Sequence, residues 1–263
     1  MMKRLEVITE EIKKKGRKAF IPFFTAFYPT EKAFADLLRA AQSSGADVVE
    51  IGLPFSDPIA DGKYIQHSSE WVLKNGFKLC RFISFFREFK KDLTIPVVIM
   101  SYLNPVYRYG FDRFADFMSR ENISGILFPD LPVEHIDFLQ DYFEKRKISV
   151  INMIAPSTEA ERIKLIAKRS KGFIYLVSVY GVTGIRKRIS RELRETVARV
   201  RNFSDKPLYA GFGISNPRQA RKIAREVDGI IVGSAIIKVI MNREADFRIK
   251  EIENFLKAMR RAI

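Results

Sequence analysis

Two carboxylates and a shortage of histidine are the first chemical features of this sequence. Glu50 lies in the apolar run Val48–Ile51, and Asp61 precedes Gly62 in the polar segment that follows. A carboxylate in a buried strand is costly unless it has a partner or a function. The chain has only 2 histidines, so general acid–base chemistry is expected to rest on carboxylates or tyrosines. The pair predicts a two-carboxylate site, although a salt-bridged structural Glu50 and an ordinary Asp61-Gly62 turn would fit the same residues.

Three glycine clusters suggest a place for an anion. They occupy residues 181–184, 211–215 and 233–235, and Ser234 in the last cluster stands where a short helix would begin. Glycine lets the backbone approach a ligand closely, and the free amides at a helix N-terminus attract negative charge. These clusters predict a phosphate site. Plain turns are the other interpretation.

The elements that must position these residues form a repeated pattern. Eight short apolar runs, typical of strands buried on both faces, lie at residues 21–25, 47–51, 95–100, 125–128, 148–151, 173–177, 207–210 and 229–232. Apolar residues at helical spacing predict helices at 31–44, 111–121, 133–147, 159–170, 190–202 and 216–226. Additional helices are expected at 3–15 and 234–241.

This alternation favours an α/β fold of the (β/α)8 TIM-barrel type over a doubly wound sheet. The barrel would carry an extra N-terminal helix and a short phosphate-binding helix after the eighth strand. Residues 1–263 are expected to form one domain. Active sites of such barrels lie at the C-terminal ends of the strands, where Asp61 and the three glycine clusters all fall.

Composition limits the classes of function. The net charge of +15 would suit a nucleic-acid ligand, an anionic substrate or a lysine-rich surface. The basic run at 186–201 lacks interleaved aromatic residues, so we expect a solvated helix face and no nucleic-acid partner. No long apolar stretch predicts a membrane span. Cys80 is the only cysteine, which excludes an internal disulfide and a thiolate-rich metal site and fits a cytoplasmic protein. No metal site is expected.

The segment Glu50–Gln66, which reads EIGLPFSDPIADGKYIQ, resembles the signature of the tryptophan synthase alpha subunit family. Further matches extend the resemblance from the first strand to the short last helix, at residues 22–26, 100–105, 129–132, 175–184, 211–215 and 232–235. The resemblance implies a carbon–carbon lyase. Its reaction would be the retro-aldol cleavage of indole-3-glycerol phosphate to indole and glyceraldehyde 3-phosphate, with no cofactor in this subunit.

The resemblance also implies roles for individual residues. Glu50 would be the general acid–base, Asp61 would accept the indole N–H and stabilise its developing positive charge, and Tyr175 would help to orient Glu50. The apolar slot for indole would consist of Phe23, Met100, Leu127 and Phe212. The phosphate would be held by Gly184, Gly213, Gly233 and Ser234. Thr183 would make a hydrogen bond when its loop closes over the substrate.

A protein partner is implied as well. The family's alpha subunit binds a beta subunit, which receives the indole, and an alpha2beta2 heterotetramer is expected. By resemblance, the partner surface includes Pro54, Asp57, Pro58 and Asn104. Three alternatives stay open: a stand-alone lyase that releases free indole, another phosphate-binding barrel enzyme of amino-acid biosynthesis, and a catalytically idle basic barrel.

Two positions depart from the family's pattern. Phe27 and Tyr180 stand where smaller residues are usual. Both leave Glu50 and Asp61 untouched.

Overall fold

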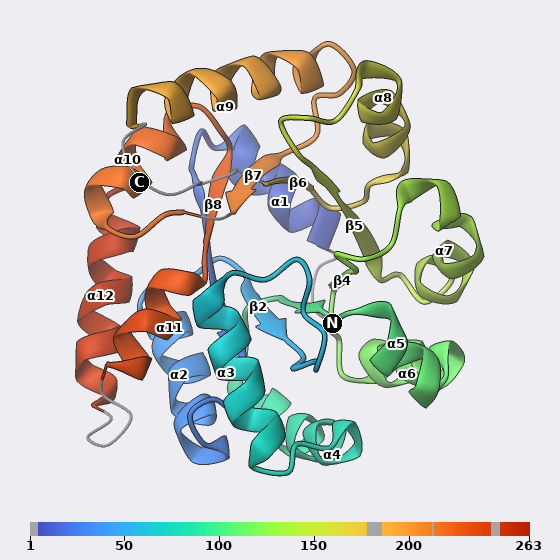
Figure 1. The fold of residues 1–263 in the computed structure, drawn as a ribbon, viewed down its shortest axis with the longest axis vertical. Coiled ribbons are helices and arrows are strands. Elements are labelled where there is room, and N and C mark those ends of the chain that lie inside the picture. Colours follow the sequence, from blue (N-terminus) through green and yellow to red (C-terminus); the bar gives the residue numbers. More distant parts are fainter. Residues whose placement is uncertain (1–4, 178–185, 212, 243–247) are drawn as a thin grey trace.

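The structure is a computed structural model, and it describes residues 5–177, 186–211, 213–242 and 248–263. Its centre is a closed barrel of eight parallel strands in chain order (Figure 1). The strands are β1 Ala19–Thr25, β2 Val49–Gly52, β3 Val97–Met100, β4 Gly125–Leu127, β5 Ser149–Ile154, β6 Ile174–Val177, β7 Leu208–Gly211 and β8 Gly229–Val232. Pairing of β1 with both β2 and β8 closes the barrel. The predicted (β/α)8 fold is confirmed, with all eight strands at the predicted places.

Helices surround the strands and bury their inner faces against them. They are α1 Leu5–Lys14, α2 Glu31–Ser43, α3 Lys63–Lys74, α4 Leu79–Phe89, α5 Leu103–Tyr109, α6 Phe111–Arg120, α7 Asp137–Glu144, α8 Ala160–Arg169, α9 Arg186–Arg201, α10 Pro217–Ala224, α11 Ser234–Met241 and α12 Ile249–Arg261. Short 3-10 turns cover Lys90–Asp92 and Val133–His135. The strands are almost entirely buried, as expected for a parallel sheet covered by helices.

The predicted helices are all present, but the prediction was incomplete. It assigned no helix at α3, α4, α5 or α12. The buried face of α3 includes Ser68 and Ser69, which weakens its apolar pattern, whereas α4 has clear helical spacing at Phe82, Ile83, Phe86 and Phe89. The predicted 133–147 helix is shorter, because a 3-10 turn precedes α7.

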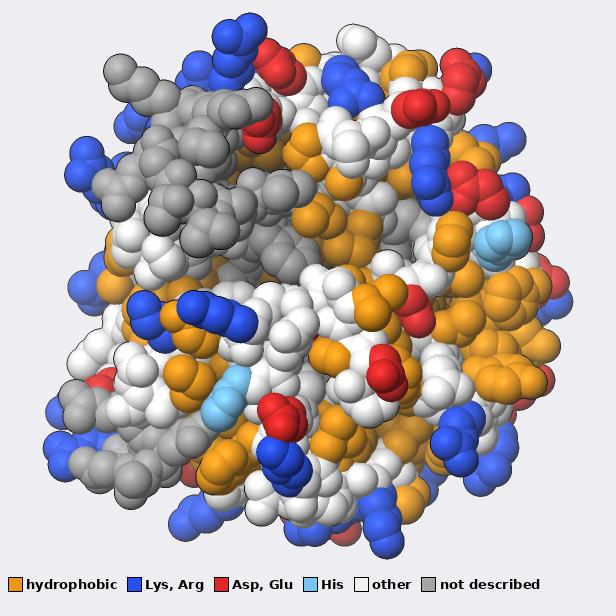
Figure 2. All heavy atoms as spheres, viewed as in Figure 1, with side chains coloured by type: hydrophobic (Ala, Val, Ile, Leu, Met, Phe, Trp, Pro, Cys, Tyr) orange, Lys and Arg blue, Asp and Glu red, His pale blue; other side chains and the backbone are white. Residues whose placement is uncertain are grey.

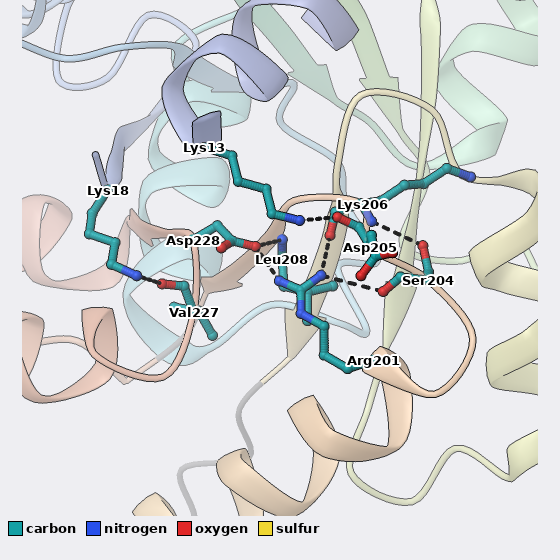
Figure 3. A network of polar contacts seen from close by, with 9 residues as sticks. All are labelled: Lys13, Lys18, Arg201, Ser204, Asp205, Lys206, Leu208, Val227 and Asp228. Carbon is teal, nitrogen blue, oxygen red and sulfur yellow. Dashed lines mark hydrogen bonds and ion pairs between the residues drawn. The ribbon is translucent and has the colours of Figure 1, made fainter. Parts of the chain in front are cut away.

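At the N-terminal ends of the strands, basic residues form hydrogen bonds and an ion pair that connect neighbouring elements (Figure 3). The Asp228 carboxylate accepts a hydrogen bond from the Leu208 amide at 2.8 Å and pairs with Arg201 of α9. Lys18 donates to the Val227 carbonyl at 2.7 Å, and Lys13 of α1 donates to the Asp205 carbonyl. These contacts join β7, β8, α1 and α9. Part of the positive charge therefore has a structural role on the face opposite the expected site.

Phe27, one of the two unusual positions, adopts a positive φ of 67°. This left-handed conformation is normally favourable only for glycine. The ring is buried among other phenylalanines and lies 5.3 to 6.0 Å, between centroids, from Phe34, Phe77, Phe82 and Phe85. Packing of this cluster of five rings offsets the backbone strain. The other unusual position, Tyr180, lies outside the described residues.

Candidate active site

Glu50 points into the barrel from the middle of β2. Side chains two residues apart share one face of a strand, so Glu50 faces the same way as Gly52. A Cβ at Gly52 would lie 2.4 Å from the Phe23 ring, which shows that Gly52 faces the interior beneath that ring. Glu50 is opposite Phe23 in the strand register and is only 2% exposed. The sequence places a carboxylate inside the barrel, as predicted.

Asp61 reaches the same region from the loop that follows β2. Its amide donates to the Pro58 carbonyl at 3.0 Å, and the Gln66 side chain of α3 donates to the Asp61 carbonyl at 2.8 Å. The loop is held against α3, and α3 is fixed to β1 by a 2.6 Å hydrogen bond between Ser68 and Thr25. These contacts fix the backbone from which the Asp61 side chain extends.

A cavity of about 210 Å³ opens at the C-terminal end of the barrel. Its described lining residues are Phe23, Asp61, Tyr64, Ile65, Met100, Tyr175, Gly213, Ile214, Ser215, Ile231, Gly233, Ser234, Ala235 and Lys238. Seven residues singled out from the sequence meet here: Phe23, Asp61, Met100, Tyr175, Gly213, Gly233 and Ser234. Glu50 and Leu127 do not line the cavity. Leu127 is 1% exposed and is paired with Met100 in the register of β3 and β4, so it lies beside Met100 on the same face of the sheet.

The two carboxyl groups have strongly altered acidity. Burial, and secondarily the charge of Asp61, raises the pKa of Glu50 to about 8. Burial raises the pKa of Asp61 to about 7, opposed by a hydrogen bond from Tyr102. Neither carboxylate oxygen of Glu50 has a hydrogen-bond partner among the described residues. Near neutral pH this pair can hold and release protons, which is the property needed for general acid–base catalysis.

Two tyrosines accompany the pair. Tyr175 is buried, and its pKa is raised well above the usual value by burial and by the charges of Glu50 and Asp61. Its hydroxyl packs against Gly211, where a Cβ would lie 2.1 Å away. It makes no hydrogen bond to the Glu50 carboxylate. Tyr102, which the sequence analysis missed, accepts a hydrogen bond from the Ala60 amide at 3.0 Å. Its place just after β3, at the catalytic end of the barrel, was the available signal.

The glycines at the far end of the cavity leave backbone accessible. Gly213 adopts a φ of 73°, a conformation that glycine favours. Gly233 precedes α11, and a Cβ there would come within 3.0 Å of the Phe23 ring. Ser234 is the first residue of α11. A free helix N-terminus between two glycines that permit close approach can bind an anion. Thr183, Gly184 and Phe212 lie outside the described residues.

The residues expected at a partner surface lie outside the cavity. Asp57 and Asn104 are exposed, Pro58 is half-buried and Pro54 is buried. Among the described residues, no three potential metal ligands of the His, Cys, Asp or Glu type cluster together. No helix in the described part of the chain is long and apolar enough to cross a membrane.

Comparisons with known proteins give one consistent result. A family model for the tryptophan synthase alpha chain matches residues 9–263. A tryptophan synthase alpha chain from Microcystis aeruginosa is 38% identical over 253 residues, covering 96% of each chain. One from Pelobacter propionicus is 36% identical over 262 residues, covering 100% of this chain and 98% of the relative.

Solved structures show the same similarity. The tryptophan synthase subunit alpha from Legionella pneumophila superposes with a TM-score of 0.91 at 33% identity, covering 100% of this chain and 99% of that one. A chain of tryptophan synthase from Mycobacterium tuberculosis, in its aminoacrylate-bound form, gives a TM-score of 0.88 at 28% identity, with 99% of both chains covered. The resemblance found in the segment Glu50–Gln66 is confirmed over nearly the full length, and the chain belongs to the tryptophan synthase alpha chain family.

Proposed function

We propose that the cavity between Glu50 and Ser234 is where this chain carries out its family's reaction. Membership makes the chain a carbon–carbon lyase of tryptophan biosynthesis, which cleaves indole-3-glycerol phosphate to indole and glyceraldehyde 3-phosphate. The observation that carries the proposal is a pair of interacting carboxyl groups with raised pKa, Asp61 in the wall of the cavity and Glu50 buried in β2, together with the N-terminus of α11 in the same wall. The carboxyl group of Asp61 can accept the indole N–H, and the amides at the start of α11 can bind the phosphate.

The reaction breaks the bond between C3 of the indole ring and the side chain. C3 gains a proton, the neighbouring side-chain hydroxyl loses one, and the electrons of the C–C bond return to the ring. Glu50, protonated near neutral pH, acts as the general acid–base for these transfers. Asp61 accepts the indole N–H and stabilises the positive charge that develops on the ring. Tyr175 keeps Glu50 in a dry environment by filling the space beside it.

The remaining contacts follow the shape of the cavity. Phe23 and Met100 flank the indole, Leu127 lies beside Met100, and Gly213, Gly233 and Ser234 receive the phosphate. By resemblance, Phe212 completes the indole slot, Gly184 the phosphate site and Thr183 a closing loop. Carboxyl groups supply the proton transfers, so we propose that this chain uses no cofactor of its own.

Indole release from indole-3-glycerol phosphate tests the assignment. We expect Glu50→Gln to lower kcat by about a hundredfold or more, the scale for loss of a general acid–base, and Asp61→Asn to lower it by a similar factor. Glu88→Gln is the matched control, since Glu88 is an exposed glutamate of α4. A folded Glu50→Gln protein with nearly normal turnover would remove Glu50 from the mechanism. An unaltered chain that releases no indole would instead favour the idle-barrel alternative.

We further propose that the chain binds a beta subunit through α5, α6, α7 and the loop after β2. Figure 2 shows hydrophobic side chains gathered over α5, α6 and α7. Ile59 in the loop is 82% exposed, Tyr107 67% and Phe138 51%. Phe111 contacts both Tyr107 and Phe138, at 5.9 and 6.0 Å between ring centroids. An apolar patch of this kind marks a protein interface.

The position of this patch matches the partner residues expected from the sequence. Asn104 is on α5, and Asp57 and Pro58 are in the same loop as Ile59. Asp130 fixes the start of α5 by accepting the Leu103 amide at 3.0 Å. The solved Mycobacterium tuberculosis relative is a tryptophan synthase, which supports a beta subunit as the partner and an alpha2beta2 assembly as its form.

Sedimentation of the chain mixed with a beta subunit tests the surface. Phe138→Ser should weaken the complex by about tenfold or more, as expected for loss of an aromatic anchor. Phe203→Ser is the control, because Phe203 is a 41% exposed phenylalanine next to the lysines of α1 and α8. Equal binding by both variants would rule out this surface. Indole release without any beta subunit, at an unchanged rate, would favour a stand-alone lyase.

We also infer that residues 1–263 act as one domain, and that the protein works in the cytoplasm. The barrel closes with strands from the whole length of the chain. Cys80 is free and exposed, as suits a reducing compartment.

A further inference from the structure

Lys238 is the only basic side chain among the described residues that line the active-site cavity. The residues predicted to hold the phosphate are Ser234 and glycines with accessible amides, and Lys238 is not among them. The substrate proposed above carries a phosphate of about two negative charges near neutral pH. A single cation in the wall of its cavity therefore calls for an explanation.

The helix places this cation at the phosphate end. Lys238 follows Ser234 by one turn of α11, and residues four apart lie on the same face of a helix. Helical side chains also lean towards the N-terminus. The Lys238 side chain therefore extends back towards Ser234 and the free amides at the start of α11, which explains why both residues line the same cavity.

Tyr64 of the neighbouring helix α3 contacts the lysine and lines the same cavity. The Lys238 Nζ lies 5.8 Å from the centre of the Tyr64 ring, within the range of a cation–π contact. Lys63 contacts the same ring, with its Nζ at 5.2 Å, but does not line the cavity. No described carboxylate forms an ion pair with Lys238, so its charge is available to a ligand.

We propose that Lys238 binds the substrate phosphate, and that Tyr64 holds the lysine where it can do so. This inference rests on the proposed function and adds a specificity-determining residue to its site. The backbone amides recognise the shape of the phosphate, whereas Lys238 supplies the full positive charge that amides lack. It favours a phosphorylated substrate over an uncharged one. Because Lys238 is exposed at the mouth, its contribution must weaken as salt rises.

Binding of glycerol 3-phosphate and of indole to the full chain, measured separately by calorimetry, tests this role without catalysis. Lys238→Met keeps the apolar stem and removes the charge. We expect its Kd for glycerol 3-phosphate to rise about five- to tenfold at low salt, the scale for loss of one charged contact, with the Kd for indole unchanged. Lys238→Arg should restore phosphate binding. Lys63→Met is the matched control, since it removes an equal charge from the same tyrosine ring and should change the Kd less than twofold.

The outcomes separate the two proposals. If Lys238→Met and Lys63→Met weaken phosphate binding equally, the effect is general surface charge and the specific role of Lys238 is refuted. If Lys238→Met binds glycerol 3-phosphate normally while the unaltered chain still cleaves indole-3-glycerol phosphate, Lys238 is refuted and the proposed function stands. If the unaltered chain binds indole but no glycerol 3-phosphate, the proposed phosphate site is refuted, and with it the roles of both Ser234 and Lys238.

Discussion

Glu50 should destabilise the folded protein at alkaline pH, and removing its charge should reveal how much. Its pKa rises from 4.5 to about 8 on folding, chiefly because the carboxyl group is buried. At 1.36 kcal/mol per pKa unit, ionising Glu50 inside the barrel costs about 5 kcal/mol. Glu50→Gln removes both the desolvation cost and the repulsion from Asp61, so we expect it to recover about 3–5 kcal/mol where Glu50 would be fully ionised.

The sign of the effect follows from proton binding. Below pH 4.5 the carboxyl group is protonated in both the folded and the unfolded chain, so Glu50→Gln changes little. Between pH 4.5 and about 8 the folded chain holds a proton that the unfolded chain has released, so the stability of the unaltered protein falls as pH rises. Above pH 8 the whole penalty is present. The advantage of Glu50→Gln must therefore grow with pH.

Urea unfolding at pH 5, 7 and 9 measures this directly. The difference in the free energy of unfolding between Glu50→Gln and the unaltered chain should increase from below about 1 kcal/mol at pH 5 to about 3–5 kcal/mol at pH 9. The corresponding gain in Tm at pH 9 is about 10 °C for a chain of this size. Glu88→Gln, an exposed control, should show no such trend. An equal difference at pH 5 and pH 9 would refute the burial argument.

Three further predictions test the rest of the site. The plot of kcat/KM against pH should be a narrow bell, because Asp61 must be ionised and Glu50 protonated. Activity should rise near pH 7, as Asp61 ionises, and fall near pH 8, as Glu50 ionises. A rising limb that survives in Asp61→Asn would contradict this assignment. Phe27→Gly relieves the strain of a positive φ but removes a buried ring. Urea unfolding should therefore show a free energy of unfolding lower by about 2–4 kcal/mol. A variant as stable as the unaltered chain would show that the ring cluster contributes little. Gly211→Ala would place a Cβ 2.1 Å from the Tyr175 hydroxyl, so it should lower the free energy of unfolding by about 1–3 kcal/mol and also slow indole release. Gly62→Ala is the control, because the space around its Cβ is open, and it should lower neither.

Much of the architecture could be predicted from local pattern. Apolar runs bounded by turns identify strands buried on both faces, and their number and alternation with helices favour a barrel. A barrel in turn places Asp61 and the glycine clusters at one end. The prediction missed α3, whose buried serines interrupt the apolar face, and it also missed α4, although the apolar residues of α4 have clear helical spacing.

Which chemical groups this protein carries, and at which end of the barrel they lie, can be read from the order of its residues. Glu50 in an apolar strand, Asp61 in the following loop and Gly233-Ser234 before a helix are all readable without coordinates. How strongly these groups interact depends on the folded barrel and cannot be read from local pattern. The pKa of Glu50 depends on burial by strands distant in sequence. Tyr102 reaches Asp61 from the turn after β3, and Lys238 lines the cavity because α11 packs beside α3. Desolvation and charge interactions depend on distances through space, and those distances are fixed only when the barrel closes.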